Sequence, residues 1–237
     1  MNLEKYQQYS RIARGLEKAD LVLKDARIVN VFTEEIIRGD IAIQDGIIAG
    51  IGSFHGKEER DLAGRYVCPG FIDSHLHLES TLVTPAELVT AASRHGTTTF
   101  IVDPHESANV SGLAGIDYIL DQTEDVKANV YVMMPSCVPA TAIDDNGCTL
   151  TAEDMVPYLH NSRILGLGEV MDSISVVQGE KSMHDKLELF EGRIRDGHAP
   201  FLEEGDLQAY AMAGIATDHE CSFFDYAMRE RRNGLTI

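Results

Sequence analysis

Apolar and polar residues alternate with a period of two between residues 19 and 64. The apolar positions fall in four short runs at 21–23, 26–31, 40–43 and 47–51. Side chains two residues apart in a strand share a face, so this alternation predicts strands with one buried face. Asp45-Gly46 separates the last two runs and is a strong signal for a hairpin turn. We therefore expect a small all-β module, preceded by a polar helical leader.

From Val67 onward, strand-like apolar runs alternate with segments of helical character. The expected strands lie near 68–77, 97–103, 129–134, 163–168, 193–197 and 214–218. The expected helices lie at 84–95, 111–123, 182–191, 205–213 and 223–232. A repeated strand–helix–strand order requires parallel strands, because each helix carries the chain back to the start of the sheet. The pattern therefore predicts an α/β barrel or a doubly wound sheet.

The helix expected at 84–95 has the best-defined ends. Thr84 is a suitable N-cap, and Pro85 suits the first helical position. Glu87 would complete a Thr-x-x-Glu capping box with Thr84. Gly96 is expected to end the helix, because glycine readily adopts the left-handed conformation found just past helix ends.

The chain ends inside this repeating pattern. Leu235-Thr236-Ile237 reads as the opening of a seventh strand, whereas a (β/α)₈ barrel has eight strands and about 250 residues. We therefore predict a truncated barrel. The predicted domains are residues 1–66, for the leader and β module, and residues 67–237, for the barrel.

Histidines and acidic residues recur where the predicted strands end. In a parallel barrel these ends meet on one rim, where catalytic groups lie. Neutral imidazoles and carboxylates are ligands for divalent cations. The predicted ligands are four histidines and one bridging carboxylate: His75, His77, His198, His219 and Glu169. Two cations held in this way would acidify a shared water and polarise an electrophile, which suits hydrolysis.

Other polar residues near this rim have roles that the pattern leaves open. Asp73 either supports a histidine ligand or satisfies backbone donors. Asp218 either contacts a ligand or orients His219. His105 and Glu106 follow the second strand and are candidates for proton transfer or substrate contact.

Composition excludes several classes of function. The chain has 20 basic and 38 acidic residues, a formal charge of −18, which opposes binding to nucleic acid or to an anionic membrane. The four cysteines are widely spaced, without a Cys-x-x-Cys pair, so we expect no disulfide framework and a reducing, cytoplasmic location. No run approaches the roughly 20 apolar residues of a membrane helix, and the N-terminus lacks the features of a signal peptide.

Several stretches resemble a known family. Pro69-Gly70-Phe71-Ile72-Asp73, followed by His75 and His77, resembles the metal-binding opening of the amidohydrolase superfamily. More specific stretches lie at 96–99, 103–110, 135–141, 166–171, 196–200 and 217–221. Together they resemble the bacterial and archaeal adenine deaminases. The resemblance spans residues 19–237 and covers only the N-terminal portion of a typical member.

The resemblance implies hydrolysis of adenine to hypoxanthine and ammonia, a step in purine salvage or catabolism. The implied centre is binuclear, with Mn²⁺ or Fe²⁺. His75 and His77 would hold the first metal, His198 and His219 the second, and Glu169 would lie between them. The implied fold is a (β/α)₈ TIM-type barrel, truncated after about six strands and preceded by part of a small β-sandwich domain. Complete family members would form homodimers.

Two alternatives remain from the sequence. The family's aspartate at the end of strand eight, a metal ligand and proton shuttle, would lie beyond Ile237, so this chain could be an inactive truncated form. The protein could also be another amidohydrolase that acts on a modified purine or a cyclic amide. The stretches at 103–106 and 135–141 disfavour this second alternative.

Overall fold

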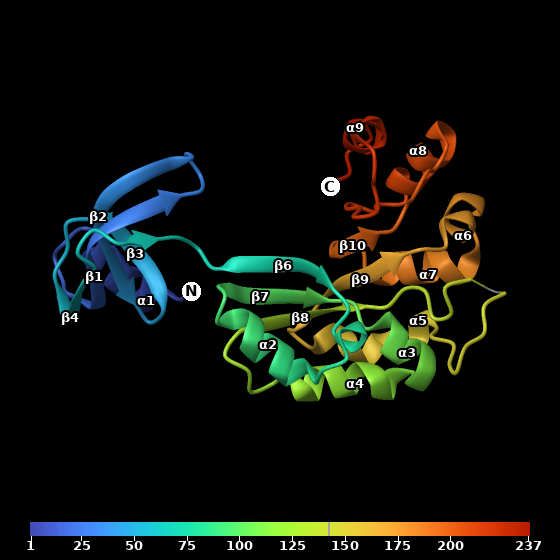
Figure 1. The fold of residues 1–237 in the computed structure, drawn as a ribbon, viewed down its shortest axis with the longest axis horizontal. Coiled ribbons are helices and arrows are strands. Elements are labelled where there is room, and N and C mark those ends of the chain that lie inside the picture. The colour runs from blue at the N-terminus through green and yellow to red at the C-terminus, as the bar shows by residue number, and fades with distance from the viewer. Residues whose placement is uncertain (142) are drawn as a thin grey trace. The chain divides into compact units, whose positions relative to one another are not determined.

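The computed structural model describes residues 1–141 and 143–237, which fold into two compact units. The first unit is Met1–Pro69 and the second is Gly70–Ile237 (Figure 1). Among the described residues, no helix is both long enough and apolar enough to cross a membrane.

The first unit contains a short helix and a mixed β-sheet. Its elements are α1 (Leu3–Ala13), β1 (Ala19–Asn30), β2 (Glu35–Gln44), β3 (Ile47–Gly52), β4 (Gly56–Asp61) and β5 (Tyr66–Val67). The strand order is β3-β2-β1-β4, and β5 also pairs with β1. Helix α1 begins with a capping bond, in which the Lys5 amide donates to Asn2 Oδ1 at 2.9 Å. This helix confirms the predicted leader.

The predicted hairpin is confirmed between β2 and β3. Gln44 pairs with Ile47, and Asp45 and Gly46 form the turn with positive φ angles of 50° and 76°. The runs predicted at 21–23 and 26–31 belong to one strand, β1, whose register shifts between Leu23 and Ala26. The alternation did not predict β4, because its sequence Gly-Lys-Glu-Glu-Arg-Asp is almost entirely charged. That strand depends on its parallel pairing with β1.

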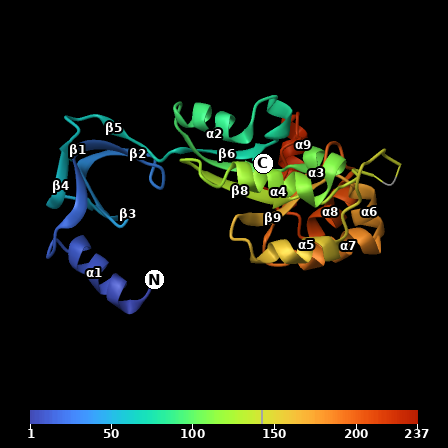
Figure 2. The same ribbon diagram turned by 90° about the horizontal axis from the view of Figure 1, so that it is seen from below.

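The second unit is built from strands and helices in alternation. Its strands are β6 (Phe71–Leu76), β7 (Thr97–Val102), β8 (Asn129–Met134), β9 (Ile164–Val170) and β10 (Ile194–Gly197). Its helices are η1 (Glu79–Thr81), α2 (Pro85–Ser93), α3 (His105–Ser111), α4 (Leu113–Gln122), α5 (Ala152–Met155), η2 (Val156–His160), α6 (Ser173–Gln178), α7 (Lys181–Leu189), α8 (Glu204–Met212) and α9 (Phe224–Arg232). The strands are parallel and lie in the order β10-β9-β8-β7-β6. This curled parallel sheet confirms the predicted barrel-type α/β fold (Figure 2).

The sixth predicted strand, at 214–218, is reduced to isolated pairing. Thr217 forms parallel bridges with Asp196 and with Thr236. The chain thus continues the parallel order of the sheet at the places where the sequence predicts the sixth and seventh strands. Among the described residues, the parallel sheet of the second unit nevertheless contains five hydrogen-bonded strands.

Helix α2 confirms part of the predicted helix at 84–95. Pro85 occupies its first turn, and Gly96, with a φ of 103°, follows its end. The predicted capping box is wrong, because the Thr84 side chain makes no capping hydrogen bond. Helices α3, α5 and α6 and the short 3-10 helices η1 and η2 were not predicted.

The main core of the second unit lies between the sheet and its covering helices. Helices α2, α3 and α4 lie along one face of the sheet (Figures 1 and 2). Phe100 and Val132 from the strands pack in one buried cluster with Ile116 and Ile119 from α4. Burying such side chains stabilises each by about 1.5–3 kcal/mol relative to exposure. The packed strands hold their carboxyl ends, where the polar residues lie, in fixed positions.

Candidate metal centre

The structure brings together all five predicted ligands. His75 and His77 lie at the end of β6, Glu169 lies near the end of β9, and His198 and His219 follow β10 and the Thr217 bridge. The distances to Glu169 Oε1 are 2.7 Å from His75 Nε2, 2.8 Å from His77 Nε2 and 3.7 Å from His219 Nε2. His198 Nδ1 lies 3.0 Å from Glu169 Oε2. The sequence expected Glu169 just after its strand, whereas β9 continues to Val170.

The two imidazoles on β6 are turned so that their Nε2 atoms converge. His77 Nδ1 lies 2.8 Å from the carbonyl oxygen of Asp103, and His75 Nδ1 lies 3.1 Å from Asp196 Oδ2. These acceptors place a proton on each Nδ1 and leave each Nε2 with a lone pair. The two Nε2 atoms are only 3.1 Å apart and both face Glu169. Such a convergence of lone pairs on a carboxylate fits a shared cation.

Several polar atoms at the centre of the site have no hydrogen-bond partner in the described part of the chain. Among the described residues, Glu169 Oε1 has no hydrogen-bond partner despite its close imidazole nitrogens, and Nδ1 of His198 and of His219 also has none. Buried polar atoms are normally paired, so unpaired ones in a cluster call for a missing ion or proton. The Glu169 side chain is 3% exposed, whereas the four imidazoles retain 20–27%.

Electrostatics at the site differ between the histidines. Burial lowers the pKa of the His75 imidazole, but the neighbouring carboxylates of Asp196 and Glu169 outweigh burial and raise the pKa to about 10. Burial and the charge of His75 instead lower the pKa of His219. Burial raises the pKa of Glu169, but its close contacts with His198, His75 and His77 hold it far below the usual range. A carboxylate kept ionised among neutral or positive imidazoles is suited to bind a divalent cation.

The five predicted ligands form two groups that share Glu169, and Asp103 and His105 form a third candidate group with it. One group is His75, His77 and Glu169, the other is Glu169, His198 and His219, and within each the ligand atoms lie within 4.8 Å of one another. This donor set of imidazole nitrogens and carboxylate oxygens suits first-row divalent metals.

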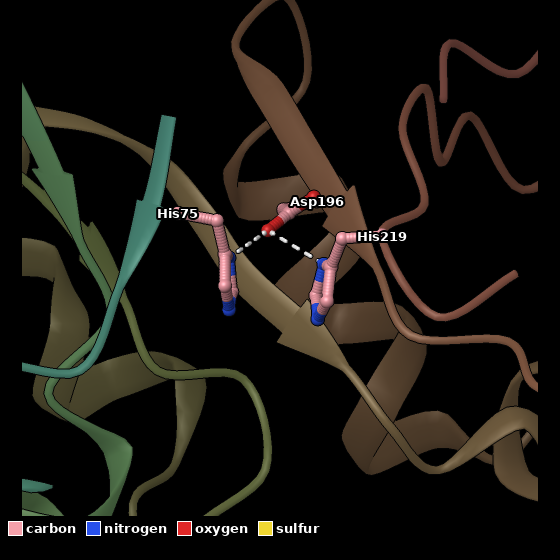
Figure 3. A group of neighbouring side chains, drawn as sticks. All are labelled: His75, Asp196 and His219. Atoms are coloured by element: carbon pink, nitrogen blue, oxygen red, sulfur yellow. Dashed lines mark hydrogen bonds and ion pairs between the residues drawn. The ribbon is translucent and has the colours of Figure 1, made fainter. Parts of the chain in front are cut away.

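Two aspartates at strand ends, Asp103 and Asp196, also belong to the site, although the sequence pattern assigned them no role. Asp103 is 1% exposed, and its Oδ2 accepts a 2.7 Å hydrogen bond from the Glu169 amide. Burial and the charge of Glu169 raise the pKa of Asp103. Asp196 contacts His75 and His219 (Figure 3). Both residues end predicted strands, as the ligands do, so strand-end position was the available signal.

The residues whose roles the sequence left undecided, His105, Glu106, Asp218 and Asp73, differ in their contacts. The His105 ring lies 4.6 Å from the ring of His77, centroid to centroid, so this residue lies beside the predicted ligands. Glu106 instead accepts a hydrogen bond from Ser80 Oγ at 2.5 Å.

Asp218 connects the loops that carry two of the histidines. Its Oδ1 accepts a 2.7 Å hydrogen bond from the Ala199 amide, and its Oδ2 accepts one of 3.0 Å from the Glu220 amide. Asp73 makes no side-chain hydrogen bond or ion pair among the described residues, although the sequence left open a contact with a histidine.

Comparison with known proteins agrees with this geometry. The profile of the amidohydrolase family matches residues 66–233. The chain belongs to the amidohydrolase family. It is 56% identical over 237 residues to an adenine deaminase from Desulfitobacterium hafniense, covering 100% of the chain and 42% of that protein. It is 48% identical over 227 residues to an adenine deaminase from Clostridium acetobutylicum, covering 95% of the chain and 40% of that protein. The chain thus spans about two-fifths of the length of these relatives.

Solved structures of two other enzymes share the fold. N-acyl-D-glutamate deacylase from Bordetella bronchiseptica has a TM-score of 0.59 at 18% identity, covering 92% of the chain and 57% of that structure. The 5-methylcytosine deaminase from Klebsiella pneumoniae has a TM-score of 0.55 at 16% identity, covering 91% and 64%. At these identities the likeness shows a shared fold and carries no information on the substrate.

Proposed function

We propose that this chain is part of an enzyme that hydrolyses adenine to hypoxanthine and ammonia. The observation that supports this most is the convergence of His75, His77, His198 and His219 on Glu169. The identity of 45–56% to several adenine deaminases favours adenine as the substrate. In the reaction, water supplies the oxygen at C6 of the purine, the C6–N bond breaks, and the amino group leaves as ammonia.

We also propose a binuclear centre that takes Mn²⁺ or Fe²⁺. His75 and His77 would hold one ion, His198 and His219 the other, and Glu169 would contact both. When bound, such ions acidify a water and polarise the electrophile. Asp103, whose carbonyl fixes His77 and whose carboxylate fixes the Glu169 backbone, keeps these ligands in place.

The leaving amino group needs a proton, and His105 is a candidate donor beside the centre. His105 lies next to His77 and contacts Asp103 Oδ1 at 3.8 Å. Glu106 contacts Ser80, so we propose that it orders the loop after β6 rather than transfers a proton. For the whole protein we further propose a cytoplasmic location, in keeping with its free cysteines, and a homodimer.

An assay across substrates tests this function. The chain, and a version extended to the length of its relatives, would be loaded with Mn²⁺ or Fe²⁺ and given adenine, methylated adenines and cyclic amides. We expect the extended protein to release ammonia and hypoxanthine from adenine. Glu169→Gln should lower turnover by about 100-fold or more, because the buried carboxylate organises the centre. The matched control Asp121→Asn removes an exposed charge at the end of α4 and should leave turnover unchanged.

Each outcome of the assay has a distinct meaning. Turnover of cyclic amides without turnover of aminopurines would overturn adenine as the substrate. Wild-type activity in the Glu169→Gln variant would overturn the proposed centre. Equal activity of the chain and the extended protein would show that no residue beyond Ile237 is needed.

A further inference from the structure

We propose that Asp196 is a positioning residue that orients one histidine from each of the two ligand groups. The inference rests on the metal centre proposed above, and it assigns a role to a carboxylate that lies outside the predicted ligand set. Asp196 sits on β10 with His75 on one side and His219 on the other (Figure 3).

The geometry places one carboxylate oxygen between two imidazoles. Asp196 Oδ2 lies 3.1 Å from His75 Nδ1 and 3.8 Å from His219 Nδ1. The two rings stack with centroids 3.7 Å apart and an interplanar angle of 23°. Their Nε2 atoms both face Glu169 Oε1. The Nδ1 edges of the rings thus face Asp196, and their Nε2 edges face the centre.

Asp196 is itself held in place. Its other oxygen, Oδ1, accepts a 2.5 Å hydrogen bond from the hydroxyl of Thr217. The same two residues form the parallel bridge that extends the sheet beyond β10. The Asp196 side chain is 13% exposed, so little water competes for its oxygens. The Asp196 carboxylate is therefore held in one orientation, which allows it to orient the imidazole rings of His75 and His219.

A carboxylate that accepts a hydrogen bond from Nδ1–H leaves the lone pair of the imidazole on Nε2 and makes that atom more basic. Loss of such a partner typically lowers metal affinity 10- to 100-fold. His77 has a different partner, the backbone carbonyl of Asp103, which a change at Asp196 leaves intact. His75 belongs to the first ligand group and His219 to the second. Loss of the Asp196 carboxylate should therefore weaken the binding of both ions together.

The experiment compares Mn²⁺ binding by the metal-free chain, Asp196→Asn, Thr217→Val and the control Asp121→Asn. Stoichiometry would be measured by elemental analysis and affinity by competition with a chelator. We expect Asp196→Asn to bind both ions about 10- to 100-fold more weakly. Thr217→Val should shift both affinities in the same direction by less, because the carboxylate remains but loses its anchor. Asp121→Asn should bind like the wild type.

A second readout does not need the metal. Nitrogen–proton NMR of the metal-free chain reports which imidazole nitrogen carries the proton. In the wild type we expect Nδ1 of His75 and of His77 to carry a proton. In Asp196→Asn, His75 should lose this preference, and His77 should keep it.

The outcomes separate the inference from the proposed centre. Unchanged affinity in Asp196→Asn, or weakening of one ion alone, would overturn the coupled role of Asp196. If the wild type binds neither Mn²⁺ nor Fe²⁺, the proposed centre fails, and the NMR comparison decides the role of Asp196 separately. If Asp196→Asn does not fold, Thr217→Val carries the same test, and wild-type affinities and tautomers in that variant would contradict the inference.

Discussion

The Asp103 carboxylate can lie against the backbone of β9 because residue 168 is a glycine and has no side chain. A Cβ added at Gly168 would lie 2.2 Å from Asp103 Oδ2. That oxygen accepts the hydrogen bond from the Glu169 amide, so the contact needs the space that glycine leaves. The glycine-rich character of β9 thus has a specific structural cause next to the predicted bridging residue.

Gly168→Ala should destabilise the chain. Asp103 is 1% exposed and cannot move without disturbing its neighbours, so we expect a loss of about 1–3 kcal/mol in the free energy of unfolding, measured by urea denaturation. Gly205→Ala is the matched control, because Gly205 lies in α8 with nothing within 4 Å of the added Cβ. That variant should gain up to about 1 kcal/mol. Equal stability of the two variants would contradict this account.

At the scale of elements, a capping motif in the sequence does not ensure a cap. Thr84 and Glu87 have the spacing of a capping box, yet the Thr84 side chain makes no capping bond. Thr151 and Asp154 do form a capping box at the start of α5. There Asp154 Oδ2 accepts the Thr151 amide at 2.8 Å, and the Asp154 amide donates to Thr151 Oγ1 at 3.4 Å.

Thr151→Ala and Thr84→Ala should therefore differ. The first removes a side chain that caps a helix, and we expect it to lower the free energy of unfolding by about 1 kcal/mol. The second removes a hydroxyl that makes no cap, so we expect a change below about 0.5 kcal/mol. Urea denaturation of both variants under one set of conditions measures the difference. A larger loss for Thr84→Ala would show that its cap forms in solution.

At the scale of the whole molecule, the site links segments that are far apart in the chain. Glu169 contacts histidines from the ends of β6 and β10 and from the loop after Thr217. A cation held by these residues would cross-link four segments of the folded chain and bind the unfolded chain far less well. Metal binding should therefore stabilise the fold.

We expect Mn²⁺ at about 100 times the dissociation constant of a site to stabilise the chain by about 2.7 kcal/mol for each ion bound. For a chain of this size each ion should raise the unfolding midpoint by roughly 5–10 °C. Thermal denaturation with Mn²⁺ and with excess chelator measures the shift. Glu169→Gln should show a much smaller response, because it lacks the carboxylate shared by both ligand groups. A wild-type midpoint that ignores Mn²⁺ would contradict a metal centre at this place.

The sequence by itself determined the alternation of strands and helices from Val67 onward and the polar residues at the strand ends. Local alternation predicts a strand, and the topology of parallel strands places all their carboxyl ends on one rim, so the strand pattern alone assigns His75 and Glu169 to one site. The Asp45-Gly46 hairpin was equally local, since its turn depends on the two residues that form it.

Only the tertiary structure decided which residues support that site. Asp103 and Asp196 act through contacts with residues distant in sequence, and nothing in their own neighbourhood distinguishes them from other strand-end carboxylates. The charged strand β4 exists through its pairing with β1, and the fate of the Thr84 cap depends on how the chain enters α2. Local patterns fix backbone conformation and direction, whereas hydrogen-bond partners depend on how distant segments pack.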